Sequence, residues 1–194
     1  MSQEHAHSTT SVSEVTLDDV GVMVSAQGDS TYFALIYERY FRRIYLYCFR
    51  HVGNAAEAED LASLVFVQAF RSIQNYRGGS VSAWLFRIAY GTVANYYRSS
   101  RSEESIDAKD REVPADIPEP LEKIMQAETH HTIRTLVASL PKDEQELLYL
   151  KIDAGLSSQE IGDLLGKSAG AVRIQMHRII KQLRERYRKI EERR

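Results

Sequence analysis

The chain has 194 residues, of which 43% are hydrophobic, and it holds one cysteine, four prolines and ten glycines. The single Cys48 excludes an intramolecular disulfide framework. No apolar run approaches the roughly 18 residues that a membrane-spanning helix needs. We therefore expect a helical, cytoplasmic protein without membrane insertion and without a secretory signal.

The formal net charge of −2 hides a strong separation of charge along the chain. Residues 1–31 carry five acidic residues and no lysine or arginine, and residues 103–128 have a net charge of −6. Residues 167–194 instead have a net charge of +7. Such a basic end on a nearly neutral protein is typical of a nucleic-acid contact, although a solvated terminal helix gives the same pattern.

The N-terminal half is predicted to be a disordered segment followed by a helical domain. Residues 1–28 are acidic and rich in serine and threonine, and they show no sustained apolar period, so we expect disorder. Residues 29–101 are predicted to form the first domain, because apolar residues recur there at every third or fourth position. Its helices are predicted over residues 31–50, 55–73 and 81–101.

The third of these helices has a composition that suits two roles. It holds arginines, tyrosines and an amide, with no acidic residue between Arg87 and Arg101. Unpaired bases can stack on such rings while cations meet phosphates, but the same side chains also fit simple packing and a favourable helix dipole. Both interpretations stay open at this point. Gly91 inside the helix costs about 1 kcal/mol relative to alanine, which predicts a close backbone neighbour.

The C-terminal half is predicted to be a flexible acidic linker followed by a second helical domain. Residues 102–120 contain Pro114, Pro118 and Pro120 and few apolar residues, which indicates a linker. Residues 121–194 are predicted to form four helices. Pro141 is expected in the first turn of the second of these.

The last two helices have the local signals of a helix-turn-helix. Ser157 and Glu160 are spaced as a capping box, Gly166 can end that helix, and Ser168 can cap the next. Gly162 supplies the small residue needed where the two helices cross. An ordinary pair of helices with a basic solvated face remains the alternative.

No pattern in the chain predicts catalysis. It has no glycine-rich phosphate loop, nucleophile elbow or Cys-x-x-Cys spacing. The adjacent His130 and His131 would point about 100° apart on a helix and could not share one ion. We therefore expect no enzyme activity, no cofactor and no metal site.

Five segments, in this order, resemble a known family. They are AEDLASLVFVQAF (58–70), YRGGSVSAWLFRIA (76–89), SLPKDEQELLYLK (139–151), GLSSQEIGDLLG (155–166) and SAGAVRIQMHR (168–178). Over about residues 30–190 the chain resembles the bacterial extracytoplasmic-function (ECF) sigma factors, a two-domain branch of the sigma-70 family. The resemblance implies an all-α fold with two small helical domains, sigma regions 2 and 4, joined by a flexible acidic linker.

The resemblance also implies a function and a set of contact residues. The protein would bind core RNA polymerase and direct promoter recognition and opening. Its partners would be the clamp helices of the largest core subunit, the flap, double-stranded promoter DNA, the melted minus-ten strand and an anti-sigma factor. The implied core-binding residues are Asp60, Leu61, Val65 and Gln68. The implied minus-ten residues are Tyr76, Arg77, Ser80, Trp84, Arg87, Asn95, Tyr96 and Arg98. The implied minus-thirty-five residues are Lys151, Ser168, Arg173, Ile174, His177 and Arg178.

Two other functions compete with this interpretation. A stand-alone two-domain helix-turn-helix regulator would bind duplex DNA tightly without polymerase, whereas one small domain makes few base contacts and binds weakly alone. A pure interaction protein would keep its activity after charge reversal at Arg173 and Arg178.

Overall fold

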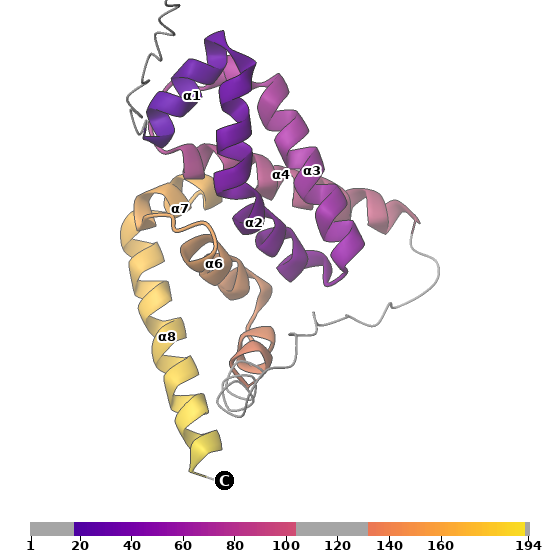
Figure 1. The fold of residues 1–194 in the computed structure, drawn as a ribbon. Coiled ribbons are helices and arrows are strands. Elements are labelled where there is room, and N and C mark those ends of the chain that lie inside the picture. The colour runs from indigo at the N-terminus through magenta and orange to yellow at the C-terminus, as the bar shows by residue number, and fades with distance from the viewer. Residues whose placement is uncertain (1–17, 104–131, 193–194) are drawn as a thin grey trace, which may run out of the picture.

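The computed structural model describes residues 18–103 and 132–192, and the regular structure in these ranges is entirely helical (Figure 1). The first domain contains α1 (Asp19–Gly28), η1 (Ser30–Tyr32), α2 (Phe33–Val52), α3 (Ala55–Arg71), η2 (Ile73–Asn75) and α4 (Val81–Glu103). The second contains a helical turn over residues 132–138, then α6 (Lys142–Ile152), α7 (Ser158–Leu165) and α8 (Ala169–Glu191). The predicted all-α, two-domain fold is confirmed. Most of the predicted linker lies outside the described residues.

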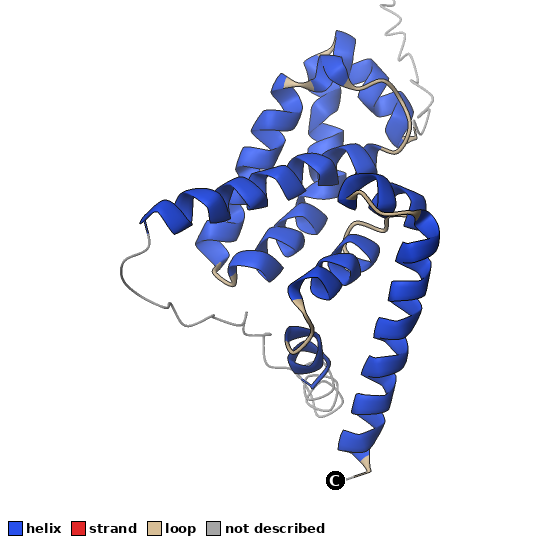
Figure 2. Cartoon of the chain, turned by 180° about the vertical axis from the view of Figure 1, so that it is seen from behind, coloured by secondary structure: helices blue, strands red, loops and turns tan. Residues whose placement is uncertain are grey.

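The first domain is a bundle of α2, α3 and α4 around an aromatic-rich core. Each helix places apolar side chains three or four positions apart on its inner face, which is the pattern that buries one side of a helix. Phe66 of α3 meets the rings of Phe33 and Tyr37 on α2 in edge-to-face geometry, with centroids 6.4 and 4.8 Å apart. Tyr47 and Phe86 are fully buried where α2 meets α4. The long α4 crosses this bundle (Figure 2).

An N-terminal helix, α1, packs on the bundle, so the prediction that residues 1–28 are disordered is wrong for its last ten residues. The carboxylate of Asp18 caps α1 by accepting a hydrogen bond from the Gly21 amide at 2.8 Å. The side chains that hold α1 to the bundle are those of Val22, Met23 and Ala26, which are buried. Val20, Val22 and Val24 alternate along the sequence as in a strand, and this alternation hides the helical period.

The helix-turn-helix of the second domain forms as its local signals predict. The Ser157 side chain accepts from the Glu160 amide and the Glu160 carboxylate accepts from the Ser157 amide, which completes the capping box. Gly166 ends α7 with a φ of 68°, and the Ser168 side chain caps α8. Pro141 lies one position earlier than expected, at the N-cap of α6 rather than in its first turn. These caps fix where the exposed face of α8 begins.

The two glycines that the sequence singles out have opposite surroundings. A Cβ atom at Gly162 would lie 2.5 Å from the backbone oxygen of Lys167 and 3.4 Å from the Ala169 nitrogen, so the helix crossing requires glycine. At Gly91 a Cβ would meet nothing within 4 Å. The predicted close backbone neighbour at Gly91 is therefore wrong.

We expect Gly162→Ala to lower the free energy of unfolding by about 2 kcal/mol, because an overpacked crossing must shift backbone atoms. Gly91→Ala is the matched control and should raise that free energy by up to about 1 kcal/mol through helix propensity alone. Urea unfolding followed by circular dichroism measures both changes. Equal effects of the two substitutions would contradict this explanation of the turn.

Candidate nucleic-acid and polymerase interfaces

One side of α8 is anchored in the second domain and the opposite side is exposed. Val172 and Ile179 are fully buried, whereas Ile174 exposes 56% of its surface. The residues that share the exposed side, called here the recognition face, are Arg173, Ile174, His177 and Arg178. A cationic helix face of this kind can enter a DNA groove and reach phosphates or guanine edges.

Two predicted minus-thirty-five residues lie beside the recognition face and have structural contacts of their own. The Ser168 hydroxyl accepts a hydrogen bond from the Ala171 amide at 3.1 Å and so serves as the N-cap of α8. Lys151 is exposed at the end of α6, and its amine donates to the Leu156 carbonyl at 2.9 Å. Both side chains therefore stabilise the helix-turn-helix, and their remaining polar surface faces solvent.

In the first domain, a continuous stripe runs along α4. Its members are spaced three or four residues apart, so they lie on one helical face. These residues, called here the α4 stripe, are Trp84, Arg87, Gly91, Asn95 and Arg98. Arg87, Asn95 and Arg98 are exposed and Trp84 is half-buried. The stripe offers two cations, an amide and an aromatic ring to a strand of nucleic acid.

The turn before α4 separates the predicted minus-ten residues into buried and exposed ones. Tyr76 is 3% exposed, and its hydroxyl donates to the Gly79 carbonyl at 2.6 Å. The Trp84 ring packs edge-on against Tyr76, with centroids 5.7 Å apart. Arg77 is exposed, and its guanidinium donates to the Gln74 carbonyl at 2.5 Å. Tyr76 therefore shapes the turn and is not placed for direct stacking on a base.

Two further residues of the predicted minus-ten set make hydrogen bonds within the first domain. The Ser80 hydroxyl accepts from the Ala83 amide at 3.1 Å at the start of α4. Tyr96 is half-buried, and its hydroxyl donates to the Glu57 carboxylate at 2.6 Å. The members of the set that are exposed are thus Arg77, Ser80, Arg87, Asn95 and Arg98, and the hydroxyl of Ser80 is already used as a cap.

On α3, the predicted core-binding residues are divided between the surface and the interior. Leu61 is 6% exposed and Val65 is fully buried, so a direct role in binding another protein is wrong for both. Asp60 is exposed, and half-buried Gln68 accepts a hydrogen bond from Thr92 at 3.3 Å. The apolar residues of α3 that do reach the surface are Leu64, Val67 and Phe70, exposed by 45%, 44% and 46%. This set, called here the α3 apolar face, is the part of the helix that suits a protein partner.

The two domains touch mainly through one side of α2, and the sequence did not predict this contact. The Ser82 hydroxyl of α4 adds a bond to the Ala154 carbonyl at 2.6 Å. The Arg50 guanidinium makes two hydrogen bonds, of 2.6 and 3.2 Å, with the carboxylate of Asp153 at the end of α6. Arg43 donates to the Asp153 carbonyl at 2.9 Å and also to the Ala154 carbonyl. The Asp153 side chain is 5% exposed, so Arg50 compensates a nearly buried charge.

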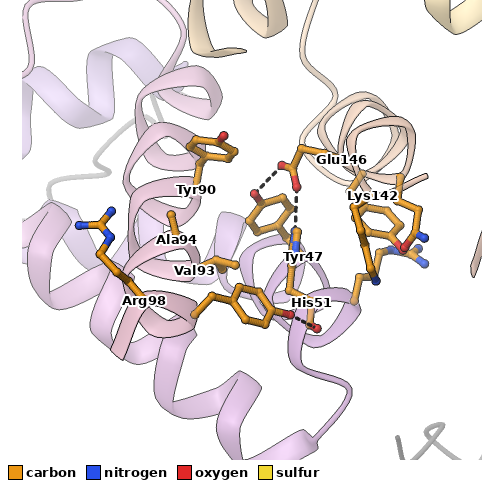
Figure 3. Close-up of a pocket in the computed structure, with 12 residues that line it drawn as sticks. Tyr47, His51, Tyr90, Val93, Ala94, Arg98, Lys142 and Glu146 are labelled. Carbon is orange, nitrogen blue, oxygen red and sulfur yellow. Dashed lines mark hydrogen bonds and ion pairs between the residues drawn. The ribbon is translucent and has the colours of Figure 1, made fainter. Parts of the chain in front are cut away.

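Glu146 of α6 makes a second cluster of contacts with α2 (Figure 3). Its carboxylate accepts from the Tyr47 hydroxyl at 2.7 Å, and its other oxygen lies 3.2 Å from Nε2 of His51. Burial raises the pKa of Tyr47 well above its usual value, and the nearby carboxylate raises it further, so the hydroxyl remains a donor. A cavity of about 520 Å³ lies beside these residues, between α2, α4 and α6.

We expect Arg50→Ala to open the contact between the domains, because it leaves the Asp153 carboxylate buried without its partner at a cost of about 3 kcal/mol. Small-angle X-ray scattering should then show a larger radius of gyration. The exchanged pair Arg50→Asp with Asp153→Arg should restore part of the compact form, and Arg42→Ala, an exposed site on the same helix, should change nothing. An unchanged radius for Arg50→Ala would show that the pair does not hold the domains together.

Two kinds of feature are absent from the described residues. No described helix is long and apolar enough to cross a membrane. Within the same ranges, no three histidine, cysteine, aspartate or glutamate residues lie close enough together to hold a metal ion.

Taken together, the fold and these surfaces define a two-domain helical protein with a helix-turn-helix in its second domain. Comparisons with known proteins agree with this class. Residues 36–103 match the family model for sigma-70 region 2, and residues 130–183 match that for sigma-70 region 4.

Comparison with individual relatives identifies the branch of the sigma-70 family. The chain is 30% identical over 172 residues to the ECF RNA polymerase sigma factor SigW of Bacillus subtilis, covering 84% of this chain and 92% of SigW. It is 30% identical over 164 residues to the ECF RNA polymerase sigma factor BldN of Streptomyces coelicolor, covering 80% of this chain but only 60% of BldN. This protein belongs to the ECF sigma factors of the sigma-70 family.

A solved structure has the same fold. CnrH, determined in complex with the cytosolic domain of CnrY, superposes with a TM-score of 0.60 at 18% identity. The match covers 84% of this chain and 93% of CnrH.

Proposed function

We propose that this protein binds core RNA polymerase and directs it to recognise and open promoters. The observation that carries the proposal is that each domain exposes a cationic helix face, the α4 stripe in the first and the recognition face of α8 in the second. The α4 stripe suits an unpaired strand, and the recognition face of α8 suits a duplex groove. In this account the protein acts without catalysis or a cofactor, in the cytoplasm.

Each surface has its own part in the proposed mechanism. The recognition face would read the minus-thirty-five element, with Arg173 and Arg178 on phosphates or guanine edges. The α4 stripe and Arg77 would hold the minus-ten strand after it leaves the duplex, since captured bases offset part of the unstacking cost. The α3 apolar face and Asp60 would contact the clamp helices of the largest core subunit. The second domain would contact the flap.

Promoter binding requires the two domains to separate. The two promoter elements lie about 25 base pairs apart, which is about 85 Å at roughly 3.4 Å per base pair. Two small domains in direct contact cannot span that distance. The pairs that join Arg50 to Asp153 and Tyr47 to Glu146 therefore break when the protein engages a promoter on polymerase.

We also propose that an anti-sigma factor controls the protein. Support comes from family membership and from the structural relative CnrH, whose solved structure contains the cytosolic domain of CnrY. Such a partner would compete for the surfaces that polymerase and promoter use.

Transcription by sigma-free core polymerase tests the proposed function. Purified protein and core are mixed with fragmented genomic DNA, and the 5′ ends of the transcripts are sequenced. We expect start sites that share two upstream elements and that disappear when either component is omitted. Tight duplex binding by the protein alone, with no effect on core, would instead identify a stand-alone regulator.

A further inference from the structure

A side-chain amide of α1 bridges the two ends of η2, the short helix that precedes the loop into α4. Nε2 of Gln27 donates to the Ile73 carbonyl at 3.0 Å and to the Tyr76 carbonyl at 2.9 Å. These are the first residue of η2 and its C-terminal cap. Because an amide nitrogen has two hydrogens, both of its donors are used on the same turn.

The exposed part of the turn begins directly after this bridge. Residues 77–80 are all exposed, and Gly78 and Gly79 have φ angles of 90° and 87°. This backbone conformation suits glycine, but glycine leaves a segment without side-chain packing to restrain it. Two hydrogen bonds restrain it instead. The Tyr76 hydroxyl donates to the Gly79 carbonyl inside the loop, and Gln27 holds the Tyr76 carbonyl at its start. The segment then leads into Val81 and the α4 stripe.

The bridge comes from outside the part of the chain that matches sigma-70 region 2. That match begins at residue 36, whereas Gln27 lies near the end of α1. The other end of α1 is held to α2 by an ion pair of 2.7 Å between Asp19 and Arg39. A helix preceding the matched region therefore fixes a turn within it.

We infer that Gln27 is a positioning residue for minus-ten recognition. It holds the turn at residues 73–76 so that the loop over residues 77–80 meets the unpaired strand in a shape already formed. The inference rests on the proposed function of the α4 stripe and names a residue, on another helix, on which that function depends. Without the bridge, the loop must be ordered when the strand binds, which lowers affinity by about tenfold.

Gln27→Met tests this role, because methionine has nearly the same length and no donors. The variant is assembled with core polymerase on a promoter mapped for the wild-type protein. We expect opening of the minus-ten element, followed by 2-aminopurine fluorescence, to fall about tenfold. Affinity for core should stay within about twofold. The Asn75 and Tyr76 amides donate to the Ser72 and Ile73 carbonyls in the turn that Gln27 holds, and their hydrogen exchange should speed up at least about tenfold while that of α2 is unchanged.

Two matched variants separate positioning from a general loss of stability. Gln74→Met removes only the bond from the Gln74 amide to the Gln27 carbonyl, which is 2.8 Å long, and should open promoters like the wild type. Asp18→Ala weakens the cap of α1 and leaves both bonds of the Gln27 amide in place. If Asp18→Ala reduces opening as much as Gln27→Met does, a positioning role is wrong.

The wild-type protein distinguishes this inference from the proposed function. If wild-type holoenzyme opens the promoter, and Gln27→Met opens it equally well with equal exchange of the Asn75 and Tyr76 amides, only the inference fails. If the wild-type protein opens no promoter at all with core, the proposed function itself fails.

Discussion

Replacing Arg173 and Arg178 with glutamate should reduce transcription that depends on the minus-thirty-five element by at least about a hundredfold. Both residues are exposed on the recognition face of α8, beside buried Val172 and Ile179. A lost base or phosphate contact costs about 1–3 kcal/mol, and a carboxylate in its place adds repulsion from the DNA backbone. Run-off transcription from a mapped promoter, with titrated holoenzyme, measures the effect.

The control for this prediction has the same change of charge on the same helix. Arg184→Glu with Arg188→Glu lies toward the C-terminal end of α8, beyond the recognition face. It should reduce transcription far less, and both double variants should bind core like the wild type. Unchanged activity for the Arg173 and Arg178 variant would contradict DNA recognition by α8 and favour a pure interaction protein.

Replacing Leu64 and Val67 with aspartate should weaken binding to core polymerase by at least about a hundredfold. Both apolar side chains belong to the α3 apolar face and expose nearly half of their surface. Residues central to an interface cost about 2 kcal/mol or more when their contacts are lost, and two buried carboxylates would add a desolvation penalty. Fluorescence anisotropy with labelled protein and sigma-free core gives the dissociation constants.

A matched pair of valines serves as the control for core binding. Val20 and Val24 of α1 are exposed by 37% and 56%. Their replacement by aspartate makes the same chemical change away from α3 and should leave core affinity within about twofold. If the two double variants lose affinity equally, the α3 apolar face is not the site of core binding.

Local signals in the sequence predicted the second domain well. The capping box at Ser157, the left-handed Gly166 and the cap at Ser168 each act within four residues, so their chemistry can be recognised without knowing the fold. Gly162 could also be identified, because a small residue is a general requirement where two helices cross.

Features that depend on distant residues could not be predicted in this way. The bonds from Arg43 and Arg50 to Asp153 join residues more than 100 positions apart, and no periodic pattern marks them. The same holds for Gln27, whose partners lie 46 and 49 residues away.

The error at Leu61 and Val65 had a different origin, because the sequence held the signal that corrects it. Both residues lie on the apolar side of α3 that helical periodicity assigns to the core, and the structure buries them. Family resemblance assigned them to the surface instead. Val67 lies on the outward side of the same helix, where periodicity leaves it exposed. Leu64 is the exception, because periodicity predicts it to be buried with Leu61 and Val65, whereas it is 45% exposed.

Photo-crosslinking on an open promoter tests most directly whether the two domains contact two separate elements. A photoreactive amino acid is placed at Asn95 in the α4 stripe or at Ile174 on the recognition face, and the crosslinked bases are mapped in the complex with core. We expect crosslinks at the minus-ten element from Asn95 and at the minus-thirty-five element from Ile174, about 25 base pairs apart. Crosslinks from both positions to the same element, or from neither to promoter DNA, would contradict it.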